Sequence, residues 1–109
     1  MPDKTQAYLV RHLRDAPAVQ CDCGLSRRIF TRQERGIPAN LHVTEITDSA
    51  RHSHADCNEY YYILEGAGKM ELGQDIIDLE PGTCVLIRPH TPHRAYGSIK
   101  AMIVMVPTE

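Results

Sequence analysis

His52-Ser-His-Ala-Asp-Cys-Asn-Glu59, followed after six residues by Gly66, is the stretch that decides the fold of this chain. It places two imidazoles and a carboxylate beside a run of strand-forming residues. Imidazole nitrogen and carboxylate oxygen are the ligands that borderline divalent metals select. On a β-strand, side chains two apart point to the same face, so His52 and His54 can reach one ion. The stretch therefore predicts a mononuclear metal site on a strand.

Glu59 lies five positions beyond His54, and an unbroken strand would put it on the opposite face. We therefore predict a turn or bulge within Ala55–Asn58, after which Glu59, Tyr61 and Ile63 share the interior face. This parity makes Tyr61 a candidate for lining a cavity, although core packing with a satisfied hydroxyl is the commoner fate of such a tyrosine.

The segment Arg88-Pro-His-Thr-Pro-His93 offers further imidazoles. A single histidine in a strand is usually a hydrogen-bonded surface or core residue. A histidine pair, a carboxylate at fixed distance and a glycine turn occur together here, and this combination favours a metal site over that simpler interpretation.

These residues resemble the two signatures of the cupin superfamily of small β-barrels. His52-x-His54-x4-Glu59-x6-Gly66 is similar to the first signature, and Gly82-x10-His93 is similar to the second; the similarity covers about residues 41–106. The resemblance implies an all-β fold, the double-stranded β-helix or jelly-roll barrel. It also implies one divalent metal ion per chain, Fe, Mn, Ni, Zn, Co or Cu, bound by His52, His54, Glu59 and His93.

Four positions depart from the signatures. Ile46 stands where the first signature opens with glycine, and Gly97 stands where the second usually has asparagine. Arg88 and His90 replace the proline and glycine that often flank Pro89. These departures affect the expected turn shapes rather than the ligands. His90 is expected to adopt a positive φ, which histidine tolerates better than β-branched residues do.

The length of the chain and the positions of its glycines and prolines predict one all-β domain. At 109 residues it is expected to form a single domain, 1–109, with N-terminal strands or an arm over 1–40 and the barrel core over 41–106. Gly66-Ala-Gly68 predicts a hairpin between Tyr60–Leu64 and Lys69–Leu72. Further turns are predicted in the ranges 73–75 and 80–82, and early strands in 8–13 and 27–31.

Composition limits the classes of partner. The net charge of −2 gives no electrostatic reason to expect nucleic acid. The longest apolar run, Ala101–Val106, is far short of the roughly 20 residues that span a bilayer. The start, residues 1–6, lacks the apolar core of a signal peptide. We expect a cytoplasmic protein with a small-molecule substrate or ligand and with neither nucleic acid nor membrane as a partner.

The four cysteines are interpreted as thiols of a reducing compartment. Cys21-Asp-Cys23 is too tight for the usual C-x2-C metal knuckle. Cys84 lies in an apolar run and is expected to behave as a small hydrophobe. Cys57 is expected to be a plain loop residue rather than a redox site.

Several polar residues compete for the cavity. His42 and Glu45 are three apart, so at most one of them can face inward on a regular strand. Arg94 should point away from the metal. A local basic cluster is interpreted as a solvated face with scattered salt bridges rather than as an anion site; it comprises Arg27, Arg28, Arg32 and Arg35.

Three histidines and one carboxylate would leave two adjacent positions open on an octahedral ion. Open positions favour a metal-dependent enzyme on a small organic substrate, which the resemblance allows as a dioxygenase, isomerase, decarboxylase or lyase. The alternative is a non-catalytic sensor of a small molecule or metal. The outward-facing Tyr60 and Tyr62 and the N-terminal segment are candidates for a homodimer interface.

Overall fold

The computed structural model describes residues 7–108, and nearly all of its regular structure is β-strand. A short 3-10 helix, η1 (Leu13–Asp15), precedes seven strands. They are β1 (Ala18–Cys21), β2 (Gly24–Phe30), β3 (Asn40–Asp48), β4 (Cys57–Leu72), β5 (Asp75–Leu79), β6 (Cys84–Ile87) and β7 (His93–Pro107). No helix in this part of the chain is long and apolar enough to cross a membrane.

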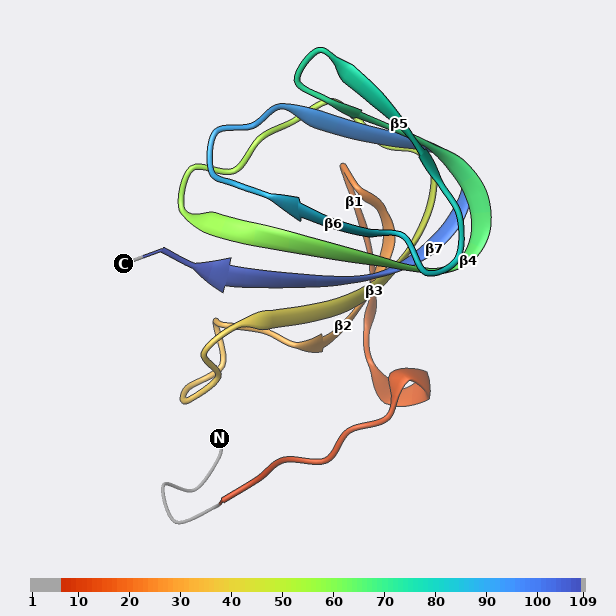
Figure 1. Ribbon diagram of the computed structural model, residues 1–109. Coiled ribbons are helices and arrows are strands. Elements are labelled where there is room, and N and C mark those ends of the chain that lie inside the picture. The colour runs from red at the N-terminus through yellow and green to blue at the C-terminus, as the bar shows by residue number, and fades with distance from the viewer. Residues whose placement is uncertain (1–6, 109) are drawn as a thin grey trace.

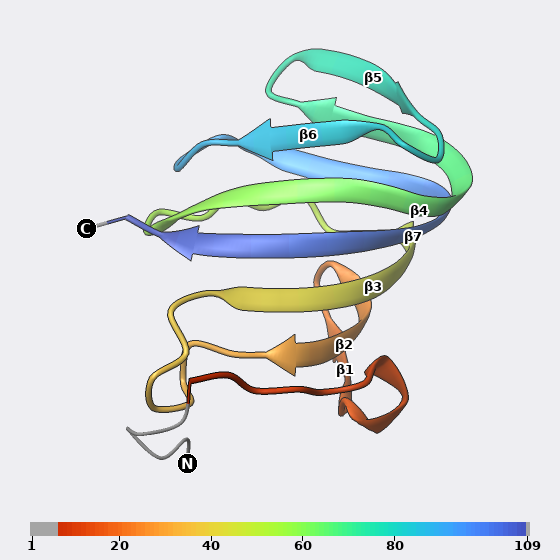
Figure 2. The ribbon, with the colours of Figure 1, turned by 60° about the horizontal axis from the view of Figure 1, so that its bottom comes forward.

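All the strands pair antiparallel in one curved sheet. The order is β1-β2-β3-β7-β4-β5, and β6 pairs with β4. Strands β4 and β7 are the longest, and they pair with each other from Cys57↔Pro107 to Leu72↔His93. Both strands curve at one end of the molecule, so the sheet folds over and encloses an interior (Figures 1 and 2).

Buried and exposed side chains alternate along β4 as predicted. Tyr61 and Ile63 are buried, whereas Tyr60 and Tyr62 are exposed on the outer face. The predicted break before this strand is confirmed as a bend at residues 55–56. Together with residues of β3, β5, β6 and β7, the inward side chains form one apolar core.

The predicted hairpin at Gly66-Ala-Gly68 is wrong, because β4 runs through these residues without reversing. The register with β7 shifts between Ile63 and Glu65, so the strand bends instead. The glycines permit a close approach of backbones: a Cβ on Gly66 would overlap the carbonyl oxygen of Ser98, and a Cβ on Gly68 would overlap that of Tyr96. Glycine here marks a crossing of strands rather than a turn.

The other predicted turns are confirmed. Gly73 and Gln74 connect β4 to β5, and residues 80–83 connect β5 to β6. The predicted strand over 27–31 lies largely within β2, but residues 8–12 have no regular structure, so the strand predicted over 8–13 is wrong. Residues 1–6, which carried the signal-peptide argument, lie outside the described part of the chain.

Gly68→Ala should lower the free energy of unfolding by about 3 kcal/mol or more, because the added methyl group meets backbone atoms that cannot rotate away. Gly73→Ala is the matched control. Its Cβ would meet nothing within 4 Å, and only the positive φ of 61° opposes it, at a cost of about 1–2 kcal/mol. Chemical denaturation of both variants checks this. Equal losses would contradict the crossing of backbones.

Candidate metal site

Reciprocal backbone hydrogen bonds join the first predicted ligand to the last. The His52 amide donates to the His93 carbonyl at 3.0 Å, and the His93 amide donates to the His52 carbonyl at 2.8 Å. This isolated antiparallel bridge holds the two Cα atoms opposite each other. Ser53 and His54 lie outside any strand, so the expectation of a regular strand through both histidines is wrong.

The turn before β7 supports His54. The amide of His90 donates to the carbonyl of His54 at 2.6 Å. His90 has a φ of 66°, which confirms the predicted left-handed conformation. Histidine at this position is thus compatible with the left-handed turn that holds this segment.

The side chains of His52, His54 and His93 converge. One ligand nitrogen from each ring lies within 4.8 Å of the others. Glu59 Oε1 lies 3.0 Å from His93 Nε2 and 3.6 Å from His54 Nε2. Both Glu59 and His93 are almost fully buried, at 3% and 1% exposure. The structure thus brings together the four residues predicted as ligands, and the three imidazoles can hold a metal ion.

Several of these atoms lack the partners that buried polar atoms normally have. His54 Nε2, Glu59 Oε1 and His93 Nε2 are buried and have no hydrogen-bond partner. An unpaired buried polar atom is costly and rare in native proteins. Three such atoms at one point fit a site that a cation completes.

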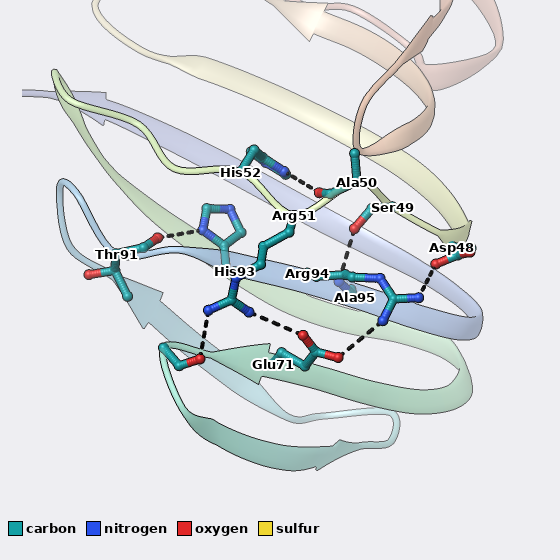
Figure 3. A network of polar contacts seen from close by, with 11 residues as sticks. Asp48, Ser49, Ala50, Arg51, His52, Glu71, Thr91, His93, Arg94 and Ala95 are labelled. Carbon is teal, nitrogen blue, oxygen red and sulfur yellow. Dashed lines mark hydrogen bonds and ion pairs between the residues drawn. The ribbon is translucent and has the colours of Figure 1, made fainter.

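The opposite ring nitrogens are already occupied. His52 Nδ1 lies 2.7 Å from the Ala50 carbonyl oxygen, and His93 Nδ1 lies 2.9 Å from that of Thr91 (Figure 3). A carbonyl can only accept, so these nitrogens carry the proton. This tautomer leaves the Nε2 lone pairs free for a metal, as in the outer-shell contacts of histidine metal sites.

The protonation of the site suits metal binding in part. Burial lowers the pKa of His54, and the Glu59 carboxylate offsets this effect only partly. Burial also lowers the pKa of His93, but Glu59 and the Thr91 carbonyl outweigh it and raise that pKa overall. A neutral imidazole is the form that coordinates, so metal binding at His93 competes with protonation of that ring.

An outer network holds the segment that leads into His52. Arg94 pairs with Asp48 and with Glu71, and Arg51 pairs with Glu71 and donates to the Gly73 carbonyl (Figure 3). The expectation that Arg94 points away from the site is confirmed. These ion pairs lie on the outside and orient the backbone around the ligands.

A cavity of about 280 Å³ opens beside the site. His52, His54 and Glu59 line it, and so does His42, whereas Glu45 is exposed, which settles the choice between those two residues. Tyr61 does not line this cavity; its ring packs edge-on to that of His93 at 6.4 Å between centroids. Burial raises the pKa of the Tyr61 hydroxyl, which stays protonated.

Sequence reasoning missed part of this lining. Ile103 and Met105 of β7 contribute apolar wall, and Arg28 of β2 contributes a cation. The assignment of Arg28 to a solvated basic face is wrong. Arg28 lies two residues after Ser26, which is fully buried, so both side chains leave the same, inward face of β2. This direction can be assigned only once β2 is known to pair with β3.

The cysteine expectations also need correction. Cys21 and Cys23 form a disulfide at the cavity rim rather than remaining two thiols. Cys84 is exposed on β6, because its parity faces outward. Cys57 is buried at the start of β4 rather than in a loop, and burial raises the pKa of its thiol, which makes it unreactive.

The geometry agrees with comparisons to known proteins. A family model described as "Cupin domain" matches residues 41–106. The chain belongs to the cupin domain family. Its fold is the jelly-roll barrel that the two signatures implied.

An uncharacterised protein of Methanocaldococcus jannaschii is 42% identical over 43 residues, 39% of this chain and 34% of that protein. Another, of Sinorhizobium fredii, is 42% identical over 53 residues, 49% of this chain and 23% of that protein. The matched part thus spans 34% and 23% of these two curated relatives.

Solved structures share the cupin fold over nearly the whole chain. A protein from Planctomyces limnophilus has a TM-score of 0.85 at 27% identity, covering 94% of this chain and 90% of its own. A predicted oxalate decarboxylase from Thermotoga maritima has a TM-score of 0.80 at 12% identity, covering 92% and 100%. Ectoine synthase from P. lautus has a TM-score of 0.78 at 19% identity, covering 92% and 78%. The last two likenesses concern the fold alone.

Proposed function

We propose that this cupin binds one divalent metal ion through His52, His54, Glu59 and His93 and acts as a metal-dependent enzyme on a small organic molecule. The observation that carries the proposal is the convergence of buried, unpartnered ligand atoms beside an open cavity. Four protein ligands leave positions free on a six-coordinate ion, in contrast to a closed structural zinc site. The volume of about 280 Å³ suits a small molecule.

The bound ion would supply Lewis-acid or oxygen chemistry at its open positions. The residues of the chain would do the rest. The carbonyls of Ala50 and Thr91 hold two imidazoles in one tautomer and orientation. Ile103 and Met105 exclude water from one wall of the cavity and strengthen electrostatic contacts inside it. This arrangement is compatible with a dioxygenase, isomerase, decarboxylase or lyase reaction.

Turnover tests this proposal. Protein loaded in turn with Fe(II), Mn(II), Ni(II), Co(II), Zn(II) or Cu(II) is mixed with a library of hydroxy acids, diketones and catechol-like compounds. Oxygen uptake, mass spectrometry and NMR follow the products. We expect turnover of at least one compound, and a loss of at least about 100-fold in His54→Ala.

His12→Ala is the matched control, because His12 precedes η1 and does not line the cavity beside the metal site. It should retain full turnover. Tight binding of a library compound with no turnover under any metal would refute the enzyme and favour the sensor, the second class that the sequence left open.

We also propose that the protein is a symmetric homodimer. The outer face of β4, β6 and β7 carries a groove lined by Tyr60, Tyr62, Leu86, Met102 and Val104, and no charged side chain of the described chain lines it. Val104 continues this face toward the N-terminal residues Tyr8, which is exposed, and Leu9, which is half-buried. An uncharged apolar face is complementary to itself about a two-fold axis, so the occupant is a second copy.

Light scattering at micromolar concentration should give the mass of a dimer. Tyr60→Ser combined with Tyr62→Ser should shift the mass to that of a monomer, because both side chains lie on the proposed face. Ile76→Ser is the control, since Ile76 is exposed on β5, away from this face. A monomeric wild-type protein would rule out the dimer.

A further inference from the structure

Arg28 and His42 face each other across the pairing of β2 and β3. They are register partners, and both line the cavity that holds the imidazole cluster. Among the described residues of this lining, Arg28 is the only lysine or arginine. Where β2 and β3 border the cavity, their inward side chains are thus polar, in contrast to the apolar core.

Among the arginines of residues 7–108 whose side chains have no hydrogen-bond or ion-pair partner, only Arg28 lines this cavity. Arg11, Arg51 and Arg94 each pair with a carboxylate, and Arg27 donates to the Ala16 carbonyl at 3.4 Å. Within residues 7–108, no carboxylate forms an ion pair with Arg28, and its buried Nε has no hydrogen-bond partner. A guanidinium is always charged and presents its donors in a fork that matches a carboxylate.

His42 adds a second unpartnered group. It is only 8% exposed, and its buried Nε2 has no hydrogen-bond partner. Burial lowers the pKa of His42, and the positive charge of Arg28 lowers it further. The neutral ring therefore offers a hydrogen bond without adding a second positive charge. A built polar pair with free hydrogen-bonding capacity, facing a cavity, is the arrangement of a ligand subsite.

We propose that Arg28 and His42 form a carboxylate subsite and that the substrate is a small organic acid. This inference rests on the proposed function. The acid group would pair with the Arg28 guanidinium, a second donor group would face the imidazole cluster, and the carbon chain would contact Ile103 and Met105. Binding at two points orients the substrate and selects acids over their neutral analogues.

The subsite is first tested without metal. Metal-free protein is titrated with acetate, propionate, butyrate and benzoate, and the Arg28 Nε–H and His42 ring signals are followed by NMR. At least one acid should bind and shift both signals, whereas its amide should not. Arg28→Gln should weaken the binding about tenfold or more, because a charge-assisted hydrogen bond is lost. Arg28→Lys should recover part of the affinity.

Arg27→Gln is the matched control. Arg27 is the next residue along β2, so its side chain leaves the opposite face of the strand. It should leave binding unchanged. A loss with Arg27→Gln as large as that with Arg28→Gln would show a general charge effect and overturn the subsite. The comparison of acid with amide needs no variant, so it decides even where Arg28→Gln fails to fold.

The metal-loaded protein is then titrated by calorimetry with malate, 2-hydroxyglutarate and 2-hydroxyadipate, each against its distal monoamide. All of these present the same hydroxy-acid end to the metal, so the distal carboxylate is the only variable. At least one diacid should bind about tenfold or more tightly than its amide, and Arg28→Gln should remove the difference.

The outcomes separate this inference from the proposed function. Binding of acids through Arg28 with no turnover under any metal would leave the subsite standing and refute the enzyme. Turnover of neutral compounds with no preference for acids in either titration would leave the enzyme standing and refute the subsite.

Discussion

The pair of backbone hydrogen bonds between His52 and His93 is the constraint on which the site depends. These two bonds join the segment before β4 to the start of β7, which are 41 positions apart in the chain. Hydrogen bonds of Ser49 with Ala95 and of His90 with His54 also hold this segment against β7 and the turn before it. Through the bonds between His52 and His93, the imidazoles project from opposed backbones into the same space, and the carbonyls of Ala50 and Thr91 fix both rings.

The long β4–β7 pairing makes this bridge possible. Because both strands bend together, the two ends of each strand lie on different layers of the barrel, and Leu72↔His93 ends the pairing next to the bridge. Gly66, Gly68 and Gly97 allow the bend, since side chains there would meet the backbone of the other strand. The conformational requirements of a few glycines thus determine where the ligands meet. Arg28 and His42 make part of the cavity lining polar, where apolar side chains would extend the core.

The sequence predicted the ligand cluster and the fold because both rest on short patterns. The odd spacing between His54 and Glu59 requires a break in the strand if both are to face one ion. Glu59 and Tyr61 face the same side because side chains of a strand alternate. The glycines were harder to interpret, because a close crossing of strands and a hairpin turn use the same residue. Arg28 was missed for a different reason: its inward direction depends on pairing between β2 and β3, which no local pattern of one strand reveals. The disulfide at Cys21 and Cys23 likewise depends on the turn that joins β1 to β2.

X-ray absorption spectroscopy on protein loaded with Zn(II) or Co(II) can determine which residues bind the ion, with the metal content determined by elemental analysis. We expect one ion per chain, bound by three imidazole nitrogens and a carboxylate oxygen, with the remaining positions filled by water. Glu59→Gln and His54→Ala should each lower the occupancy sharply. A first shell that contains sulfur, or full occupancy retained in both variants, would contradict this expectation.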